Sequence, residues 1–288
     1  MAHALTTPDM TFEEHGPLAR ITLNRPEHYN ALSRELSDTL VRTFEYVRDS
    51  MSIKWLVIAG AGGNFCVGDD ITEFPDWHDA NYAMHRCRYY QNMANQLEEL
   101  DKITIAAVEG YAVGGGLEIT MACDFVVATE SARWGMPEVD VGITPGWGGT
   151  TRMSRLIGRR LTKEINLIGA LHPARRAVEL TLWNRAVPDG ELESEVQKLV
   201  DVLATKHQQG LRQLKFIINR GVEADLYTAQ GFEALSASLT FAVNGMWEVD
   251  DADKGAGIRG FIEKNELWHA RRGPAMDFWV DEVGTAAS

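Results

Sequence analysis

The chain has 288 residues, of which 45% are hydrophobic and 24% charged, and its formal net charge at pH 7 is −13. This composition is typical of a soluble globular protein that buries a large core. The negative charge disfavours nucleic acid or an anionic membrane as the main partner, although a few cations in a cleft still allow an anionic small ligand. No apolar run approaches a membrane span, and the N-terminal segment lacks the pattern of a secretory or transit signal, so we expect a cytoplasmic protein.

The first half of the sequence alternates predicted strands with predicted helices. Short apolar runs predict buried strands, and apolar residues three or four positions apart predict helices, one of them capped by Ser33. This alternation is typical of an α/β protein. The predicted strands are 18–24, 55–60, 103–113 and 125–130, and the predicted helices are 31–49, 82–100 and a short one that follows a triple glycine.

After Arg152 the pattern becomes mainly helical, and the tail from Trp268 has no clear period. Helices are predicted at 160–169, 193–206, 209–221 and about 226–246.

The cysteines and histidines show no spacing that is typical of a disulfide framework or a metal site. Cys66, Cys87 and Cys123 show no paired spacing, and the eight histidines show no metal-binding spacing; we therefore expect neither a disulfide framework nor a bound metal. Cys66 stands beside a glycine turn without a histidine positioned to activate it, so we expect a small buried residue and not a nucleophile.

Two glycine turns each follow a predicted buried strand. In "AVGGGLE" (112–118) the turn leads into a helix, whose first N–H groups lack internal partners, and the N–H of Gly115 is among them. In "GGNFCVGDDI" (62–71) Gly68 makes a sharp turn and exposes the N–H of Asp69. Two such donors that converge would form an oxyanion hole. The alternative is that both segments are only tight turns.

Two carboxylates accompany these turns. Glu118 lies in the first turn of the short helix, where an acid also complements the helix dipole, and Glu138 lies on a loop in "WGMPEVDVGITPGWGGT" (134–150). Two carboxylates close together cannot both ionise easily, and the pair then supplies one acid and one base. Beside an oxyanion hole, that pair suits proton transfer next to a carbonyl, or addition of water one carbon further out.

Five segments in order resemble the enoyl-CoA hydratase/isomerase, or crotonase, family. They are "LNRPEHYNALS" (23–33), "FCVGDDI" (65–71), "AAVEGYAVGGGLEITMACD" (106–124), "MPEVDVGITPGWGGTTRMSRLIG" (136–158) and "GIRGFIEK" (257–264).

The resemblance implies an α/β fold in which ββα units wind into a spiral, followed by a C-terminal helical trimerisation region. We expect the spiral core with the acyl-CoA site in residues 1–205, and a region for oligomerisation and active-site cover in 206–288. The implied partners are an acyl-CoA substrate and further copies of the chain in a homotrimer or homohexamer. No separate cofactor is implied, because coenzyme A is part of the substrate.

The resemblance also assigns roles at the reaction centre. The N–H groups of Asp69 and Gly115 would hold the thioester oxygen. Glu118 would activate a water for attack at C3 of an enoyl thioester, and Glu138 would supply the proton to C2. Both acids are present, which favours hydration; double-bond isomerisation, dehydration, retro-aldol cleavage and a non-catalytic binding relative remain the alternatives.

Further positions are assigned to substrate binding by the same resemblance. For Lys264 the alternative is a solvated lysine at a helix end. The positions are Arg25, Ala31, Val67, Asp70, Ile71, Gly114, Pro145, Trp147, Phe261 and Lys264.

Aromatic residues depart from the usual pattern of the family. Trp147 stands where many relatives carry a small residue, and Trp77, Tyr89 and Tyr90 fall near the segment that usually lines the acyl pocket. One hypothesis is a branched, cyclic or aromatic acyl group, since aromatic side chains form flat walls. The alternative is core packing, which we favour for Trp134, a tryptophan at a position where relatives commonly carry phenylalanine.

Overall fold

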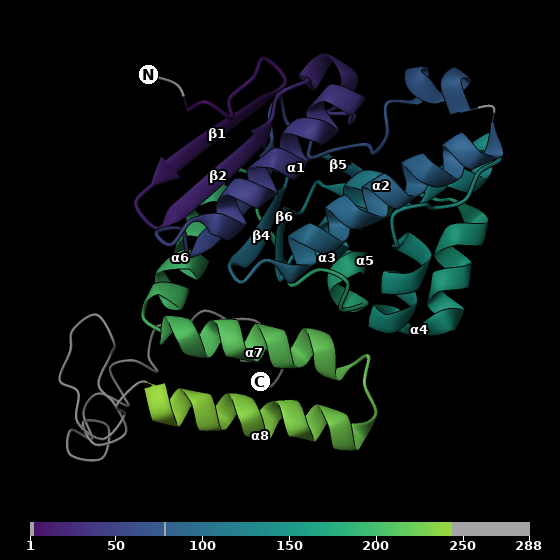
Figure 1. The fold of residues 1–288 in the computed structure, drawn as a ribbon. Coiled ribbons are helices and arrows are strands. Elements are labelled where there is room, and N and C mark those ends of the chain that lie inside the picture. The colour runs from purple at the N-terminus through teal and green to yellow at the C-terminus, as the bar shows by residue number, and fades with distance from the viewer. Residues whose placement is uncertain (1–2, 78, 244–288) are drawn as a thin grey trace, which may run out of the picture. The chain divides into compact units, whose positions relative to one another are not determined.

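The computed structural model describes residues 3–77 and 79–243 (Figure 1). Phe261, Lys264 and the tail from Trp268 lie outside the described residues, so the predictions about them stay predictions. The chain divides after Val196 into two compact units.

The first unit contains a six-stranded sheet. It is ordered β1 (Met10–His15), β2 (Leu18–Leu23), β3 (Trp55–Gly60), β4 (Ile103–Val108), β6 (Phe125–Thr129) and β9 (Arg185–Val187). β1 and β2 are antiparallel, and the remaining neighbours are parallel. Almost every residue of β3 and β4 is buried, as the continuous apolar runs predicted.

A second, three-stranded sheet is ordered β5 (Tyr111–Val113), β7 (Arg133–Gly135) and β8 (His172–Pro173). The prediction of one strand over 103–113 was wrong, because the chain bends at Gly110 and passes from the first sheet to the second. Gly110 has φ +59°, and a Cβ there would lie 2.1 Å from the carbonyl oxygen of Gly63. Only glycine fits both the conformation and the space.

This bend creates a repeated unit of two strands and a helix. β4 and β5 lead into α3 (Gly115–Ala122), and β6 and β7 lead through a short 3-10 helix into α4 (Gly149–Ile168). α4 is kinked at Gly158, whose backbone is not helical (φ 78°, ψ 159°). Each repeat places a turn between the second sheet and a helix, and these turns carry the site.

The other predicted helices of the first unit are present. α1 (Arg34–Asp49) begins after Ser33, whose hydroxyl accepts the N–H of Leu36 at 3.2 Å as expected for an N-cap. α2 (Ala80–Glu99) runs beside α1 in Figure 1, and α5 (Ala174–Glu179), which the sequence analysis did not predict, precedes β9. Leu36, Leu40 and Phe44 recur on one face of α1 and join the core.

The second unit contains two helices that pack on each other. α6 (Leu192–Ala204) crosses the division between the units, and α7 (Gln208–Gly221) and α8 (Leu226–Val243) follow it. The Phe216 and Phe232 rings lie 5.8 Å apart between α7 and α8. No helix among the described residues has the length and apolar character needed to cross a bilayer.

Candidate active site

The triple glycine forms the start of α3. Gly114 is the N-cap with φ +53°, and its N–H donates to the Gly135 carbonyl in the second sheet at 3.0 Å. Gly115, the first helical residue, is buried. Within the described part of the chain its N–H has no hydrogen-bond acceptor. A donor therefore remains available at the positive end of the helix dipole.

The second glycine turn lies against the first. Cys66 donates its N–H to the Tyr111 carbonyl at 2.9 Å, and Val113 donates to the Cys66 carbonyl at 3.0 Å, so the two segments run in parallel. A Cβ at Gly68, where φ is +91°, would lie 2.7 Å from the N atom of Gly115. The next residue, Asp69, also has an N–H without an acceptor among the described residues. The structure thus brings together the two amides expected to form an oxyanion hole.

Glu118 is held rigidly in the first turn of α3. Its side chain is buried, and Oε1 accepts the N–H of Trp147 at 2.9 Å and of Gly149 at 2.5 Å. Burial raises the pKa of Glu118 to about 8. The two amide donors oppose this rise, while the nearby Glu138 and Asp69 carboxyls add to it.

Glu138 lies beside the same glycine turn. The segment expected to be a loop is a short 3-10 helix, Pro137–Val141, which ends at Gly142 with φ +76°. A Cβ at Gly114 would lie 3.2 Å from Oε1 of Glu138, so the carboxyl group faces the triple glycine. Its Oε2 atom is buried without a partner in the described part of the structure, and burial raises its pKa.

A third carboxyl group belongs to Asp69, of which the sequence analysis used only the amide. Its Oδ1 atom is buried and has no hydrogen-bond partner among the residues described. Burial raises the pKa of Asp69 to about 7, against the lowering effects of Tyr90, Arg86 and Trp147 nearby. The pair of acids in "VGDD" is the signal that could have drawn attention to this side chain.

Trp147 underlies the reaction centre. A Cβ at Gly115 would lie 2.7 Å from its ring, so the indole packs directly on that glycine. The ring stacks on Tyr90 with centroids 4.3 Å apart, and Tyr90 stacks on Trp77 at 6.2 Å. Trp134, by contrast, is fully buried and donates its indole N–H to the Pro173 carbonyl, which confirms the expected core role.

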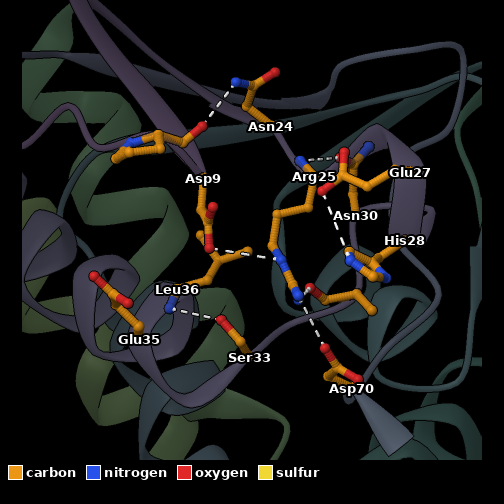
Figure 2. A network of polar contacts seen from close by, with 12 residues as sticks. Asp9, Asn24, Arg25, Glu27, His28, Asn30, Ser33, Glu35, Leu36 and Asp70 are labelled. Carbon is orange, nitrogen blue, oxygen red and sulfur yellow. Dashed lines mark hydrogen bonds and ion pairs between the residues drawn. The ribbon is translucent and has the colours of Figure 1, made fainter. Parts of the chain in front are cut away.

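Arg25 belongs to a separate polar network (Figure 2). Its guanidinium lies between Asp70, at 3.0 Å, and Asp9, at 3.5 Å, and it donates to the Ala31 carbonyl at 2.7 Å. Burial raises the pKa of Asp70, but hydrogen bonds from Thr72 and Arg25 outweigh it and the net shift is downward. These charges compensate one another, so the network stabilises the local conformation of the chain.

The remaining predicted positions fall around these two groups. Gly114 and Ala31 are buried, Val67 and Pro145 are half-buried, and Ile71 is exposed. Their roles in substrate binding stay predictions. Cys66 is buried as expected, and burial raises the pKa of its thiol to about 12. Within residues 3–77 and 79–243, no group of three or more histidine, cysteine, aspartate or glutamate side chains is arranged to hold a metal ion.

Comparison with known proteins identifies the family. The sequence model of the enoyl-CoA hydratase/isomerase family matches residues 13–271. The chain belongs to this family. It is 33% identical over 259 residues to a crotonyl-CoA hydratase of Syntrophomonas wolfei, with 90% of this chain and 96% of the relative covered. It is also 33% identical over 268 residues to a short-chain-enoyl-CoA hydratase of Clostridium acetobutylicum, with the same coverage.

Solved structures carry the same fold. A putative enoyl-CoA hydratase of Thermobifida fusca, solved in complex with acetoacetyl-CoA, superposes with a TM-score of 0.76 at 27% identity, covering 82% of this chain and 96% of the other. The expected crotonase-like α/β fold is therefore confirmed. Curated relatives at about a third identity support a hydratase-type activity.

Proposed function

We propose that this protein is an enoyl-CoA hydratase, which adds water across the 2,3 double bond of an enoyl-CoA thioester. One observation carries the proposal. Two glutamates, the buried Glu118 and the half-buried Glu138, lie at the same glycine turn as two amides that have no acceptor in the described structure. The names of the curated relatives and the acetoacetyl-CoA complex of the Thermobifida protein support an acyl thioester as the ligand.

In the proposed reaction, the amides of Asp69 and Gly115 hold the thioester oxygen. Glu118 removes a proton from water as its oxygen forms a bond to C3. The double-bond electrons move toward the thioester, and negative charge develops on the oxygen that the two amides hold. Glu138 then gives a proton to C2, so hydrogen and hydroxyl are both added. Donors in place before the charge develops lower the barrier without reorganisation.

The electrostatics of the site keep a proton available for this reaction. Hydration needs one ionised and one protonated carboxyl group at the same moment. Burial raises the pKa of both glutamates, and the nearby Glu138 carboxyl adds to the rise at Glu118. Near neutral pH we expect the pair to carry one proton, which belongs to the pair and not to either residue.

The binding of the coenzyme A part of the ligand and the assembly of the chain are proposed from the family resemblance. We propose that the turn organised by Arg25 and Asp70 receives the nucleotide end of coenzyme A, with Arg25 acting mainly as the residue that holds this turn. We also propose that the chain assembles as a homotrimer or homohexamer. Exposed apolar side chains on the C-terminal helices support association; they include Leu214, Phe216, Ile218, Leu235, Leu239 and Phe241.

The direct test follows the absorbance of the conjugated thioester when crotonyl-CoA is mixed with the protein. We expect the absorbance to fall as 3-hydroxybutyryl-CoA forms. Glu118→Gln and Glu138→Gln should each lower kcat by about 10²–10⁴-fold, the usual contribution of general acid–base catalysis. Identification of the product by mass separates hydration from isomerisation, because only hydration adds the mass of water. Full turnover by both variants would refute the assignment of the acid and the base.

A further inference from the structure

The side chain of Trp147 has no role in the proposed reaction, yet it lies against the start of α3. The residue is only 2% exposed. A Cβ built on Gly115 would come within 2.7 to 3.0 Å of three outer atoms of the six-membered ring of the indole. The ring therefore packs on the residue whose amide is proposed to hold the thioester oxygen.

Main-chain contacts fix another side of the same turn. A Cβ at Gly68 would lie 2.7 Å from the N atom of Gly115, and one at Gly116 would lie 2.0 Å from the carbonyl oxygen of Cys66. These contacts join backbone to backbone and do not depend on a side chain. The start of α3 is thus held by the neighbouring glycine turn and by the indole of Trp147.

The main chain of Trp147 contacts the proposed base. Its N–H donates to Oε1 of Glu118 at 2.9 Å, and the N–H of Gly149 donates to the same atom at 2.5 Å. Trp147 therefore contacts Gly115 through its side chain and Glu118 through its amide. These two residues are the first and the fourth of α3, so one tryptophan contacts both ends of the first helical turn.

α2 holds the turn that carries Trp147. The side chain of Gln91 donates to the Gly146 carbonyl at 2.8 Å. The neighbouring ring of Tyr90 stacks on the indole, with 4.3 Å between the centroids and 15° between the planes. The turn is therefore fixed to α2 on both the main-chain and the side-chain side.

Arg152, in the first turn of α4, provides a third connection to α2. It donates to the Trp147 carbonyl at 2.8 Å, and its other guanidinium nitrogens donate to the Glu98 carboxylate at 2.7 and 3.0 Å. A buried ring whose own backbone is held in this way has little freedom to move, which is what a group that supports a reaction centre requires.

We propose that Trp147 is a positioning residue, whose indole fixes the Gly115 amide relative to the Glu118 carboxyl group. The inference rests on the proposed function for the roles of that amide and that carboxyl group. An oxyanion donor acts only when it points to the place where negative charge develops. A displacement of about 1 Å in a reaction centre can cost about 10²-fold in rate.

The first test removes the indole and keeps the main-chain amide of Trp147. Trp147→Ala should lower kcat for crotonyl-CoA by about 10–100-fold and change KM little, because the position of the donor matters most in the transition state. Trp147→Phe retains a ring that stacks on Tyr90 but reaches less far toward Gly115, so its kcat should fall by a smaller factor. The phenylalanine variant keeps the test decisive should the alanine variant fail to fold.

A second readout reports on the two amides without the addition of water. Acetoacetyl-CoA has no 2,3 double bond to hydrate, but it loses a proton from C2 to form an enolate that absorbs in the near ultraviolet. Hydrogen bonds to the thioester oxygen stabilise the enolate, so a pH titration of the bound ligand measures their strength. We expect its ionisation constant to fall by about 10-fold in Trp147→Ala and by less in Trp147→Phe. A residue that only fills the core would leave this constant unchanged.

Trp55→Ala and Trp55→Phe are the matched controls. Trp55 is also buried, at 5% exposed, but it lies at the start of β3, whereas the glycine turn follows the end of that strand. Its variants should lose stability and keep the kcat and the ionisation constant of the parent protein. Parental values of both quantities in the folded Trp147 variants, or equal falls in the Trp55 variants, would overturn the inference.

Failure of this inference and failure of the proposed function are distinguishable. Hydration of crotonyl-CoA by the unmodified protein, with parental kcat and enolate ionisation in the Trp147 variants, would remove only the role of the indole. Weaker enolate ionisation in the Trp147 variants, without hydration of crotonyl-CoA by the unmodified protein, would remove only the proposed reaction.

Discussion

Carboxyl groups are paired with a cation in the Arg25 network but not in the described part of the reaction centre. In the network, one guanidinium lies between two carboxylates, and the net shift of the Asp70 pKa is downward (Figure 2). In the reaction centre, three carboxyl groups lie together, no cation among the described residues forms an ion pair with them, and the pKa of each is raised. Carboxylates paired with a cation stabilise the conformation of the chain. Buried acids without such a partner keep protons available near neutral pH.

The largest expected effect comes from closing the oxyanion hole. In Gly115→Ala the new Cβ would lie 2.7 Å from the Trp147 ring and would displace the helix start. We expect kcat for crotonyl-CoA to fall by at least about 10²-fold, comparable to the loss of one oxyanion donor. Circular dichroism checks that the variant is folded.

Gly231→Ala in α8 is the control for this substitution, since a Cβ there meets no atom within 4 Å. It should leave kcat unchanged and stabilise the helix slightly. A Gly115→Ala protein that folds and retains full activity would show that its amide is not part of the site.

A smaller effect is expected from removing the cation of the network. Arg25→Ala leaves Asp9 and Asp70 without their common partner, so urea denaturation should show a loss of about 3 kcal/mol in the free energy of unfolding. Arg48→Ala, which removes an exposed pair with Asp49, should leave the free energy of unfolding nearly unchanged. Equal losses in the two variants would contradict the structural role of Arg25.

The smallest expected effect is a pH dependence of the protein's stability, which arises from Glu118. Its pKa is raised in the folded state from an ordinary 4.5 to about 8, so the folded protein binds the proton more tightly than the unfolded chain does. The stability that this proton gives is complete below pH 4.5 and is lost as pH rises toward 8. Glu118→Gln does not titrate, so its stability relative to the parent should rise by about 2 kcal/mol between pH 5 and pH 7.

Urea denaturation at several pH values measures this trend. Glu13→Gln, on the exposed face of β1, is the control and should follow the parent protein throughout. A difference between Glu118→Gln and the parent that stays flat with pH would show that Glu118 is already ionised in the folded protein at pH 5.

Local patterns in the sequence were sufficient for much of the fold. Continuous apolar runs marked β3, β4 and β6, and a serine before an amphipathic segment marked the start of α1. The order of five motifs indicated the family, and the glycine turns indicated the two amides. These features depend on the conformational preferences of residues that are neighbours in the sequence, so they can be predicted from the residue types alone.

Only the tertiary structure decided how distant residues meet. The bend at Gly110 depends on the carbonyl of Gly63, and the setting of Glu118 depends on amides about 30 positions further along the chain. The pKa of Asp69, raised by burial and lowered by Tyr90 and Trp147, likewise depends on residues from other segments of the chain. Burial sets the pKa values of these acids, and it is produced by packing between segments that are remote in sequence.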